Sequence, residues 1–256
     1  MTDLVKIEIE DSVIIVRLNR QDKKNALTGV MYQGLADALE QLENDPGLHV
    51  ALITGTKDCF TAGNDLVDFM ESSGIAGDSP VSRFLRNIAN ARKPVIAAVN
   101  GPAVGVGTTM LLHCDLVYAA PGAKFIMPFV NLGLCPEAGS SLLLPQLIGH
   151  RRAAELLMFG DGVNAEQAKE MGLINEIVSV DTYQEYALNK ARQLAQQPPQ
   201  SVRVTKQLMR QGNEEILKSV MKAESEIFSA MLQGPEAKEA FSAFFEKRKP
   251  DFSKLG

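Results

Sequence analysis

Two short stretches carry most of the information in this chain: CFTAGNDL (residues 59–66) and NGPAVGVG (residues 100–107). Each places small residues directly before an apolar, helix-like segment, and the second follows a strand-like run from Pro94 to Val99. The first main-chain N–H groups of a helix have no partner within the helix, and the helix dipole favours negative charge beside them. Two such ends that meet at one point form an oxyanion hole, which stabilises the charged oxygen of an enolate. The same glycines also suit plain turns that let helices pack closely, so only convergence distinguishes the two interpretations.

The composition is that of an ordinary globular protein and argues against several classes of partner. The chain has 256 residues, of which 45% are hydrophobic and 22% charged, enough for one large domain or a domain with an appendage. The formal net charge of −5 argues against nucleic acid or an anionic membrane as the main partner. Three cysteines without CxxC spacing and three scattered histidines predict neither a disulfide framework nor a metal site. Because the N-terminus lacks a signal-peptide pattern and no run of about 18 uncharged apolar residues occurs, we expect a cytoplasmic protein without a membrane span.

Strand-like and helix-like segments alternate in the first half of the chain. Thr28 is suited to cap a helix that runs to about Asn44. Short alternating or β-branched runs predict strands at residues 5–10, 13–18, 50–54, 95–99, 116–119 and 124–126. The Gly- and Ser-rich segment from Ser72 to Ser79 predicts a mobile loop.

The second half of the chain is mainly helical. From Ala138 onward the pattern predicts helices, with one strand near residues 176–180 and a boundary at Pro198-Pro199. Two helices are predicted beyond that boundary. Apolar residues on the first and phenylalanines on the second are typical of core or subunit contacts, so we expect this region to mediate oligomerisation.

In these residues the chain resembles the crotonase superfamily of enoyl-CoA hydratases and isomerases. The matching segments, in order, are FTAGNDL (60–66), PVIAAVNG (94–101), CDL (114–116), residues 125–139, residues 165–178 and FEKR (245–248). The resemblance covers nearly the whole chain. It implies an α/β fold, a crotonase-type spiral of ββα units formed by residues 1–197, with a helical trimerisation region in residues 198–256. It further implies a homotrimer or a dimer of trimers and an acyl-CoA thioester substrate, with coenzyme A entering as part of that substrate and no separate cofactor.

The resemblance also implies which residues bind the thioester. The oxyanion donors are the main-chain N–H groups of Asn64 and Val106. Many relatives have glycine where Val106 stands, but the donor is main-chain, so the side chain alters the pocket more than the chemistry. The remaining substrate-binding positions that the resemblance implies are Lys24, Ala26, Ala62, Gly63, Asp65, Leu66, Gly105, Phe129 and Leu132.

The hydratases of this superfamily resemble one another in using two glutamates to add water across a double bond. Those two positions are Thr109 and Phe129 in this chain. Water addition needs one group to activate the water and another to protonate the α-carbon, and neither threonine nor phenylalanine is an acid or base at neutral pH. A classical hydratase is therefore disfavoured.

Glu137 is the one carboxylate left in the matching region. Its surroundings, PEAGSS (136–141), are similar to the motif of peroxisomal-type Δ3,Δ2-enoyl-CoA isomerases, in which this glutamate is the sole acid and base. Moving a double bond from C3–C4 to C2–C3 takes one proton from C2 and returns one to C4, so one carboxylate suffices. Apolar neighbours such as Phe129 and Leu134 are expected to raise the pKa of Glu137 toward the working range of a general base. The alternative is that Glu137 merely begins a helix, where the dipole favours acids.

Other polar residues have simpler explanations. Asp65 and Asp68 stand where they can cap a helix, Asp115 is expected to form structural hydrogen bonds, and His113 lacks an acid partner. The Gly105-x-Gly107 pair lacks the third glycine of a dinucleotide loop. The leading interpretation is thus a 3-enoyl-CoA isomerase. The alternatives are an isomerase of another CoA thioester, as in aromatic degradation, and a non-catalytic acyl-CoA-binding or scaffold protein.

Overall fold

The large sheet of the molecule has six strands in the order β1-β2-β3-β4-β6-β9. In the computed structural model, which describes residues 3–71, 77–253 and 255, β1 and β2 are antiparallel and all the other neighbours in this sheet are parallel. The strands are β1 (Val5–Glu10), β2 (Val13–Leu18), β3 (Val50–Thr54), β4 (Val95–Val99), β6 (Leu116–Ala119) and β9 (Glu176–Ile177). Five of them confirm predicted strands, whereas β9 is shorter than residues 176–180.

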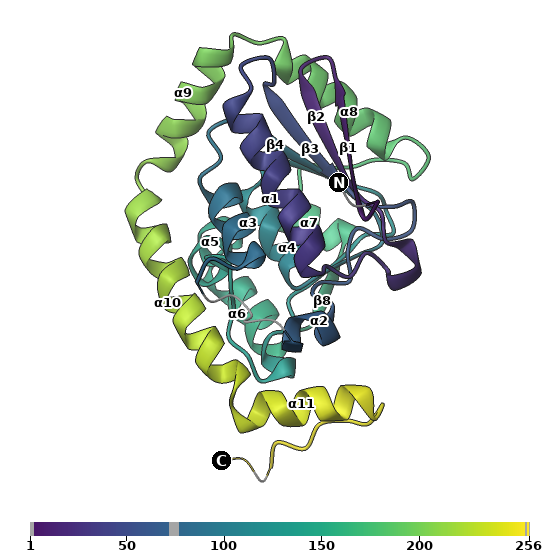
Figure 1. The fold of residues 1–256 in the computed structure, drawn as a ribbon, viewed down its shortest axis with the longest axis vertical. Helices are drawn as coiled ribbons and strands as arrows, with labels where there is room; N and C mark the ends of the chain where they lie inside the picture. The colour runs from purple at the N-terminus through teal and green to yellow at the C-terminus, as the bar shows by residue number, and fades with distance from the viewer. Residues whose placement is uncertain (1–2, 72–76, 254, 256) are drawn as a thin grey trace.

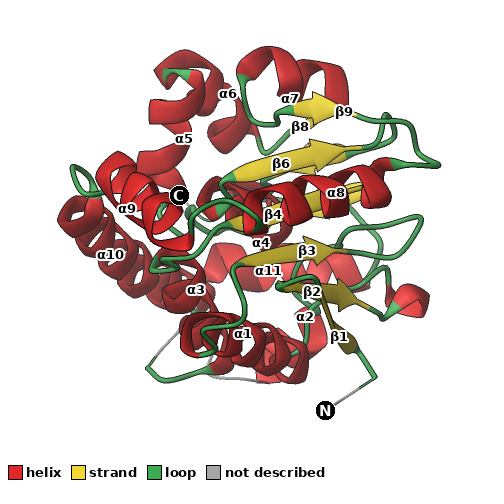
Figure 2. Cartoon of the chain, turned by 90° about the horizontal axis from the view of Figure 1, so that it is seen from above, coloured by secondary structure: helices red, strands yellow, loops and turns green. Residues whose placement is uncertain are grey.

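Both faces of the large sheet are buried, because successive side chains of a strand point to opposite sides. In β2, Val13 and Ile15 pack in a smaller cluster with α8 (Tyr183–Ala195), whereas Ile14 and Val16 pack in the main core with α1 (Gly29–Asn44). Figure 2 shows the sheet from above, with helices on both of its sides. Every residue of β3 and β4 is buried, and apart from Thr54 all of them are apolar, as burial on both faces requires.

A second, three-stranded sheet lies in the order β5-β7-β8. It consists of β5 (Pro102–Val104), β7 (Lys124–Ile126) and β8 (Gly162–Asn164). The strand at residues 124–126 was predicted, but β5 and β8 were not, since their short runs contain Pro102, Gly162 and Asn164, residue types that are depleted in strands. β5 lies within the second Gly-rich stretch, so that stretch is a short strand followed by a helix rather than one turn.

The remaining helices surround these sheets. Thr28 caps α1 as predicted, its hydroxyl accepting a hydrogen bond from the N–H of Met31. The other helices of the core are α2 (Leu66–Glu71), α3 (Pro80–Ala89), α4 (Val106–Thr109), α5 (Ser140–Ile148), α6 (His150–Phe159) and α7 (Ala165–Met171), with 3-10 helices η1 (Gln21–Lys23), η2 (Met110–His113) and η3 (Val130–Leu132). Ser79 caps α3, and residues 72–76 of the loop predicted at 72–79 lie outside the described residues.

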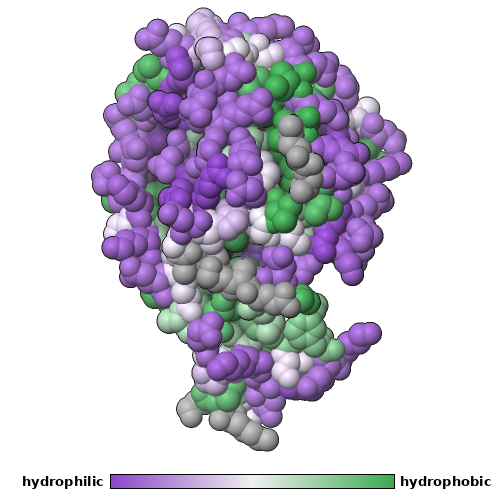
Figure 3. Space-filling model, viewed as in Figure 1, coloured by the Kyte–Doolittle hydropathy of each residue, from purple (hydrophilic) through white to green (hydrophobic). Residues whose placement is uncertain are grey.

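Three helices, not the two predicted, follow Pro198. They are α9 (Pro199–Arg210), α10 (Glu214–Leu232) and α11 (Pro235–Phe245). The prediction missed α9 because its surface is mostly exposed and polar. Figure 1 shows α9 and α10 running down one side of the core and α11 crossing its lower end. On the face drawn in Figure 3, hydrophilic residues predominate, and hydrophobic ones gather in two areas, one in the upper half of the view and one where the core meets α11.

The buried side of α10 also differs from expectation. Its fully buried residues are Glu224 and Phe228, whereas Ile216 and Ile227 are half exposed. α10 therefore turns a carboxylate toward the core. No helix within the described residues is long and apolar enough to cross a membrane.

Candidate active site

The two Gly-rich stretches lie side by side. The N–H of Thr61 donates to the carbonyl of Pro102 at 3.0 Å, and the N–H of Val104 donates to the carbonyl of Thr61 at 3.0 Å. Gly63, with φ of +87°, lies against Val104 so closely that a Cβ at Gly63 would be 2.8 Å from the Val104 carbonyl oxygen. Close backbone approach and a left-handed conformation both require glycine here. The two stretches are thus direct neighbours in the fold, which the oxyanion-hole interpretation requires.

Each stretch leads into a helix start. Asn64 stands two residues before α2, and Val106 is the first residue of α4, preceded by Gly105 with φ of +56°. Within the described chain, neither the Asn64 nor the Val106 main-chain N–H has a hydrogen-bond partner. A Cβ at Gly105 would meet no atom within 4 Å, so this side of the turn is open. Two free donors beside open space suit a developing negative charge.

The segment from Lys24 to Leu27, which contains the predicted substrate-binding positions Lys24 and Ala26, runs alongside the first Gly-rich stretch. The N–H of Ala62 donates to the Lys24 carbonyl at 2.9 Å, and the N–H of Leu27 donates to the Gly63 carbonyl at 2.8 Å. Lys24 and Asn25 have φ of +50° and +53°, and the fully buried Asn25 side chain holds this bend by donating to the carbonyls of Cys59 and Phe60. Lys24, Ala26, Ala62 and Gly63 are therefore neighbours, as their predicted shared ligand requires.

The two aspartates after this stretch act as caps. Asp65 accepts hydrogen bonds from the N–H groups of Val67 and Asp68 at the start of α2, and an ion pair of 2.7 Å from Arg20. The Arg20 contacts help to hold the pKa of Asp65 below its ordinary value, although burial opposes them as the largest single influence. Asp68 accepts from the N–H of Gly29 at 2.9 Å, at the start of α1. The helix-capping prediction for both residues is confirmed.

Glu137 is buried, with only 3% of its surface exposed. Burial raises its pKa from 4.5 to about 7; the Glu224 charge raises it further, and a hydrogen bond from Thr109 opposes both. The Thr109 hydroxyl donates to Glu137 Oε1 at 2.6 Å. Thr109 closes the single turn of α4 that begins at Val106, so this bond brings Glu137 to the helix whose first N–H is a predicted oxyanion donor.

Glu137 does not begin a helix. α5 starts three residues later at Ser140, whose N–H and Oγ–H both donate to the Glu137 carbonyl. Between them, Ala138 and Gly139 have φ of +59° and +73°. The explanation of Glu137 as a first-turn acid is therefore wrong: a left-handed turn separates it from the helix.

Tyr32 links the first stretch to Glu137. Its hydroxyl donates to Asn64 Oδ1. Burial raises the pKa of Tyr32 well above its ordinary value, and the nearby carboxylates of Glu137 and Asp68 add to this. Tyr32 therefore lies close to both Asn64 and Glu137. Thr109 thus links Glu137 to the helix that begins at Val106, and Tyr32 links Asn64 to the surroundings of Glu137.

Three phenylalanine rings from separate elements pack against one another. Phe129, where hydratases have their second glutamate, packs edge-on against Phe228 of α10 with ring centroids 6.5 Å apart. Phe69 of α2 packs edge-on against the same ring at 6.1 Å. Leu132 of η3 is half-buried against the main core. Phe129 and Phe69 therefore meet through a residue of the C-terminal region.

The sequence did not identify three of these contributors. Thr109 was recognised only as a missing glutamate, although a hydroxyl there is a natural donor to a carboxylate. Tyr32 is one apolar-face residue among several on α1, and Glu224 lies on a helix whose expected buried stripe was apolar. Nothing in the local pattern marks the last two.

His113 and Asp115 have structural roles, as expected. Burial lowers the pKa of His113 to about 4, and its Nε2–H donates to the Ala138 carbonyl at 2.7 Å. Asp115 accepts from the N–H of Val95 and from Nζ of the buried Lys206 at 2.6 Å, which ties α9 to the sheet. The described residues contain no group of three or more His, Cys, Asp or Glu side chains placed to hold a metal ion.

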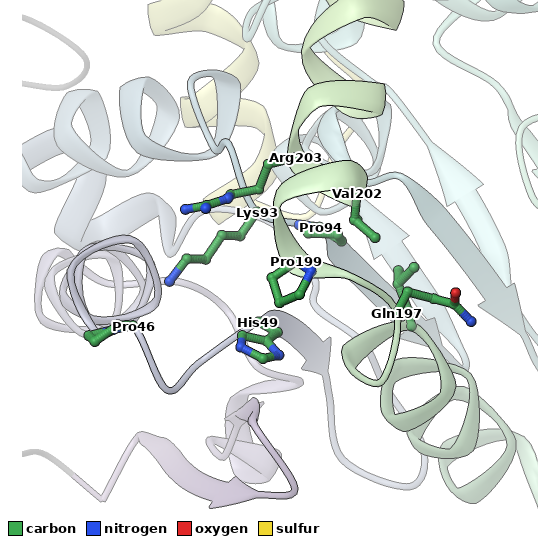
Figure 4. A pocket seen from close by; sticks show the side chains of 9 residues that line it. Pro46, His49, Lys93, Pro94, Gln197, Pro199, Val202 and Arg203 are labelled. Carbon is green, nitrogen blue, oxygen red and sulfur yellow. The ribbon is translucent and has the colours of Figure 1, made fainter.

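A separate cavity of about 150 Å³ lies at the amino ends of β3 and β4 (Figure 4). It is lined in part by His49, Lys93, Pro199 and Arg203. None of the predicted site residues lines it, and the Lys93 ammonium donates instead to the carbonyls of Leu42 and Asp45. The Gly-rich stretches follow the carboxyl ends of the same strands, which is where open α/β sheets bind ligands.

Known proteins match this chain over nearly its whole length. A model of the enoyl-CoA hydratase/isomerase family matches residues 8–254. The chain is 36% identical to 1,2-epoxyphenylacetyl-CoA isomerase of Escherichia coli, covering 99% of both chains. It is 34% identical to enoyl-CoA delta isomerase 2 of Rattus norvegicus, covering 95% of this chain and 64% of that protein. It is 33% identical to 2,3-dehydroadipyl-CoA hydratase of E. coli, covering 98% of this chain and 99% of the relative.

Solved structures agree with this result. OdaA of Pseudomonas aeruginosa is 49% identical, with a TM-score of 0.92 over 95% of this chain and 99% of that chain. An enoyl-CoA hydratase/isomerase from Pseudoalteromonas atlantica is 42% identical, with a TM-score of 0.93 over 97% of this chain and 99% of that chain. The chain therefore belongs to the enoyl-CoA hydratase/isomerase family and is an enzyme of the crotonase superfamily that acts on CoA thioesters.

Proposed function

We propose that this protein is a Δ3,Δ2-enoyl-CoA isomerase in which Glu137 moves the proton. The observation that carries the proposal is the environment of this one carboxylate: it is buried, its pKa is raised to about 7, and it accepts a hydrogen bond from Thr109 in the helix that follows the second Gly-rich stretch. A general base is most effective when its pKa lies near the working pH.

The proposed reaction has two proton transfers and no net change in composition. The thioester oxygen accepts hydrogen bonds from the N–H groups of Asn64 and Val106. Glu137, ionised, takes a proton from C2, and the electron pair moves into a dienolate whose oxygen carries the charge. The same carboxyl group then returns the proton to C4, leaving the double bond between C2 and C3. No further cofactor is needed, because CoA is part of the substrate.

Two features favour isomerisation over hydration. The positions of both hydratase glutamates hold Thr109 and Phe129. Thr109 donates to Glu137, and Phe129 packs against Phe228. Phenylalanine offers no group that could activate the water that hydration consumes, and a single carboxylate cannot both activate water and protonate carbon in one step.

A second candidate is an isomerase of an aromatic CoA thioester. It is favoured by the relative named 1,2-epoxyphenylacetyl-CoA isomerase, which aligns along 99% of this chain. The same base and the same pair of main-chain donors serve an enolate formed from such a substrate.

The test compares the native protein with Glu137→Gln on 3-enoyl-CoA substrates of several lengths, with 2-enoyl-CoA hydration assayed in parallel. We expect kcat for isomerisation to fall roughly 10²–10⁴-fold in Glu137→Gln, with CoA-ester binding retained and hydration low in both proteins. Native kcat should fall as pH drops below about 7, because protonation of Glu137 removes the base.

The other outcomes each select a different function. Unchanged isomerisation in Glu137→Gln removes this residue as the base. Activity on an aromatic CoA thioester alone selects the second candidate. Binding of acyl-CoA without turnover in any assay leaves a binding or scaffold protein.

A further inference from the structure

One buried carboxylate outside the proposed reaction holds the turn that carries Glu137. Glu224 Oε2 accepts from the N–H of Gly139 at 2.6 Å, while Oε1 accepts from the N–H of Ser141 at 3.0 Å and from its Oγ–H at 2.5 Å. α5 has no side-chain cap of its own. Glu224, which is 7% exposed, therefore caps α5 from another helix, 85 residues away from Gly139 in the chain.

The turn itself needs external support. Ala138 has φ of +59°, a conformation that costs energy for any residue with a Cβ. The Ala138 carbonyl accepts from His113 Nε2–H on one side. On the other side α10 lies directly on Gly139: a Cβ there would be 2.4 Å from Leu217 Cδ1 and 3.2 Å from Met221 Cγ. The peptide that follows Glu137 is thus held between η2 and α10.

Few charged groups surround Glu137 besides Glu224. Tyr32 faces it from α1 and Cys135 from its own loop, and burial raises the pKa of both of these groups. His113 of η2 reaches it only through the Ala138 carbonyl, with Lys206 and Arg210 beyond the imidazole. Thr109 of α4 donates a hydrogen bond to the carboxyl group. Among these, Glu224 is the acid whose charge raises the pKa of Glu137.

We propose that Glu224 is a positioning residue for the isomerisation: by holding Gly139 and Ser141 it fixes the strained turn that aims the Glu137 carboxylate at the substrate. This inference rests on the proposed function of Glu137. It also makes the site depend on α10, a helix of the C-terminal region, and so on correct docking of that helix against α5.

The test is Glu224→Gln, which keeps the side-chain length and one oxygen acceptor but removes the charge. The first measurement is the pKa of Glu137 itself, obtained from a carbon-13 NMR titration of the side-chain carboxyl groups. The Glu137 signal is assigned by its loss in Glu137→Gln. We expect the pKa of Glu137 to fall in Glu224→Gln, because a charge that raises it is gone. The second measurement is kcat at high pH, where Glu137 is ionised in both proteins. We expect kcat to fall tenfold or more with KM little changed, since residues 24–27 and 62–66 lie on other elements.

Two further variants serve as controls. Glu226→Gln removes a charge from an exposed position of the same helix and should leave the Glu137 pKa and kcat unchanged. Ser141→Ala keeps the Glu224 charge and both N–H donors but removes the hydroxyl donor, so kcat should fall severalfold while the Glu137 pKa changes little. Ser141 is exposed, so this variant tests the turn even if Glu224→Gln does not fold.

The proposal is overturned if folded Glu224→Gln keeps both the native Glu137 pKa and the native kcat at high pH. It is equally overturned if Glu224→Gln does not fold and Ser141→Ala has native kcat. If the native protein isomerises no substrate, the proposed function fails, yet the NMR titration still decides whether Glu224 governs Glu137.

Discussion

The chemistry available to Glu137 depends on opposing influences that meet at one side chain. Burial and the Glu224 charge disfavour its ionised form, whereas the Thr109 hydroxyl favours it. The resulting pKa of about 7 leaves both protonation states populated at neutral pH. A carboxyl group that must first take a proton and then give it back benefits from this balance.

Thr109→Val tests the opposing contribution. Valine has nearly the same shape but cannot donate a hydrogen bond, so the ionised form of Glu137 loses its partner. We expect the pKa of Glu137 to rise by about one unit. The acidic limb of the kcat–pH profile then moves to higher pH, and kcat at pH 7 falls roughly fivefold. This direction is opposite to that expected for Glu224→Gln.

The matched control for Thr109→Val is Thr109→Ser, which keeps the hydroxyl. In this variant the acidic limb of the kcat–pH profile should stay at its native pH. An acidic limb at the native pH in Thr109→Val would show that the 2.6 Å contact does not govern the ionisation of Glu137.

At the scale of elements, the proposed oxyanion hole depends on a backbone contact between two stretches. Gly63 lies against the carbonyl of Val104, the residue before Gly105, and α4 begins directly after Gly105. The spacing between the Asn64 and Val106 N–H groups is therefore set by how closely residues 61–64 can approach residues 102–106. A side chain at Gly63 would push the stretches apart.

Gly63→Ala is expected to lower kcat about 10²-fold, the effect of losing one oxyanion donor, because the added Cβ would lie 2.8 Å from the Val104 oxygen. Steady-state kinetics on a 3-enoyl-CoA substrate measures this. Gly172→Ala is the matched control: Gly172 has a similar φ of +81°, but a Cβ there meets nothing within 4 Å. Equal activity in the two variants would mean that the contact at Gly63 has no part in catalysis.

At the scale of the whole molecule, the C-terminal helices have two sides with different properties. Toward the core they supply Glu224, Phe228 and the buried ion pair of Lys206 with Asp115. Away from it, Leu208 of α9 is 60% exposed and Phe244 of α11 is 59% exposed. Large exposed apolar side chains such as these are typical of contacts between subunits.

We therefore expect sedimentation equilibrium at tens of micromolar to give three or six times the mass of one chain. Leu208→Glu should lower the association, because a carboxylate buried in an apolar contact is costly. Ile9→Glu, at an exposed apolar position of the edge strand β1, serves as the control and should leave the mass unchanged. A monomeric native protein would contradict the predicted assembly.

Much of this protein was determined by local sequence patterns. The helix after Thr28, six strand segments, the capping aspartates and the order of the family motifs could all be predicted, because caps, turns and strand periodicity report hydrogen bonds and burial over a few residues. The choice of Glu137 came from a motif whose order along the chain matched a known family. Short elements such as β5 and β8, and the polar helix α9, lack the length or contrast that such patterns need.

Only the tertiary structure decided which distant residues meet at the site. Thr109 contacts Glu137 across 28 residues, Tyr32 contacts Asn64 across 32, and Glu224 contacts Gly139 across 85. The pKa of Glu137 depends on the water that its neighbours exclude and on a charge from another helix, and both depend on packing. A local pattern records which side chains are present, but the electrostatic environment of a buried group is the sum over everything folded around it.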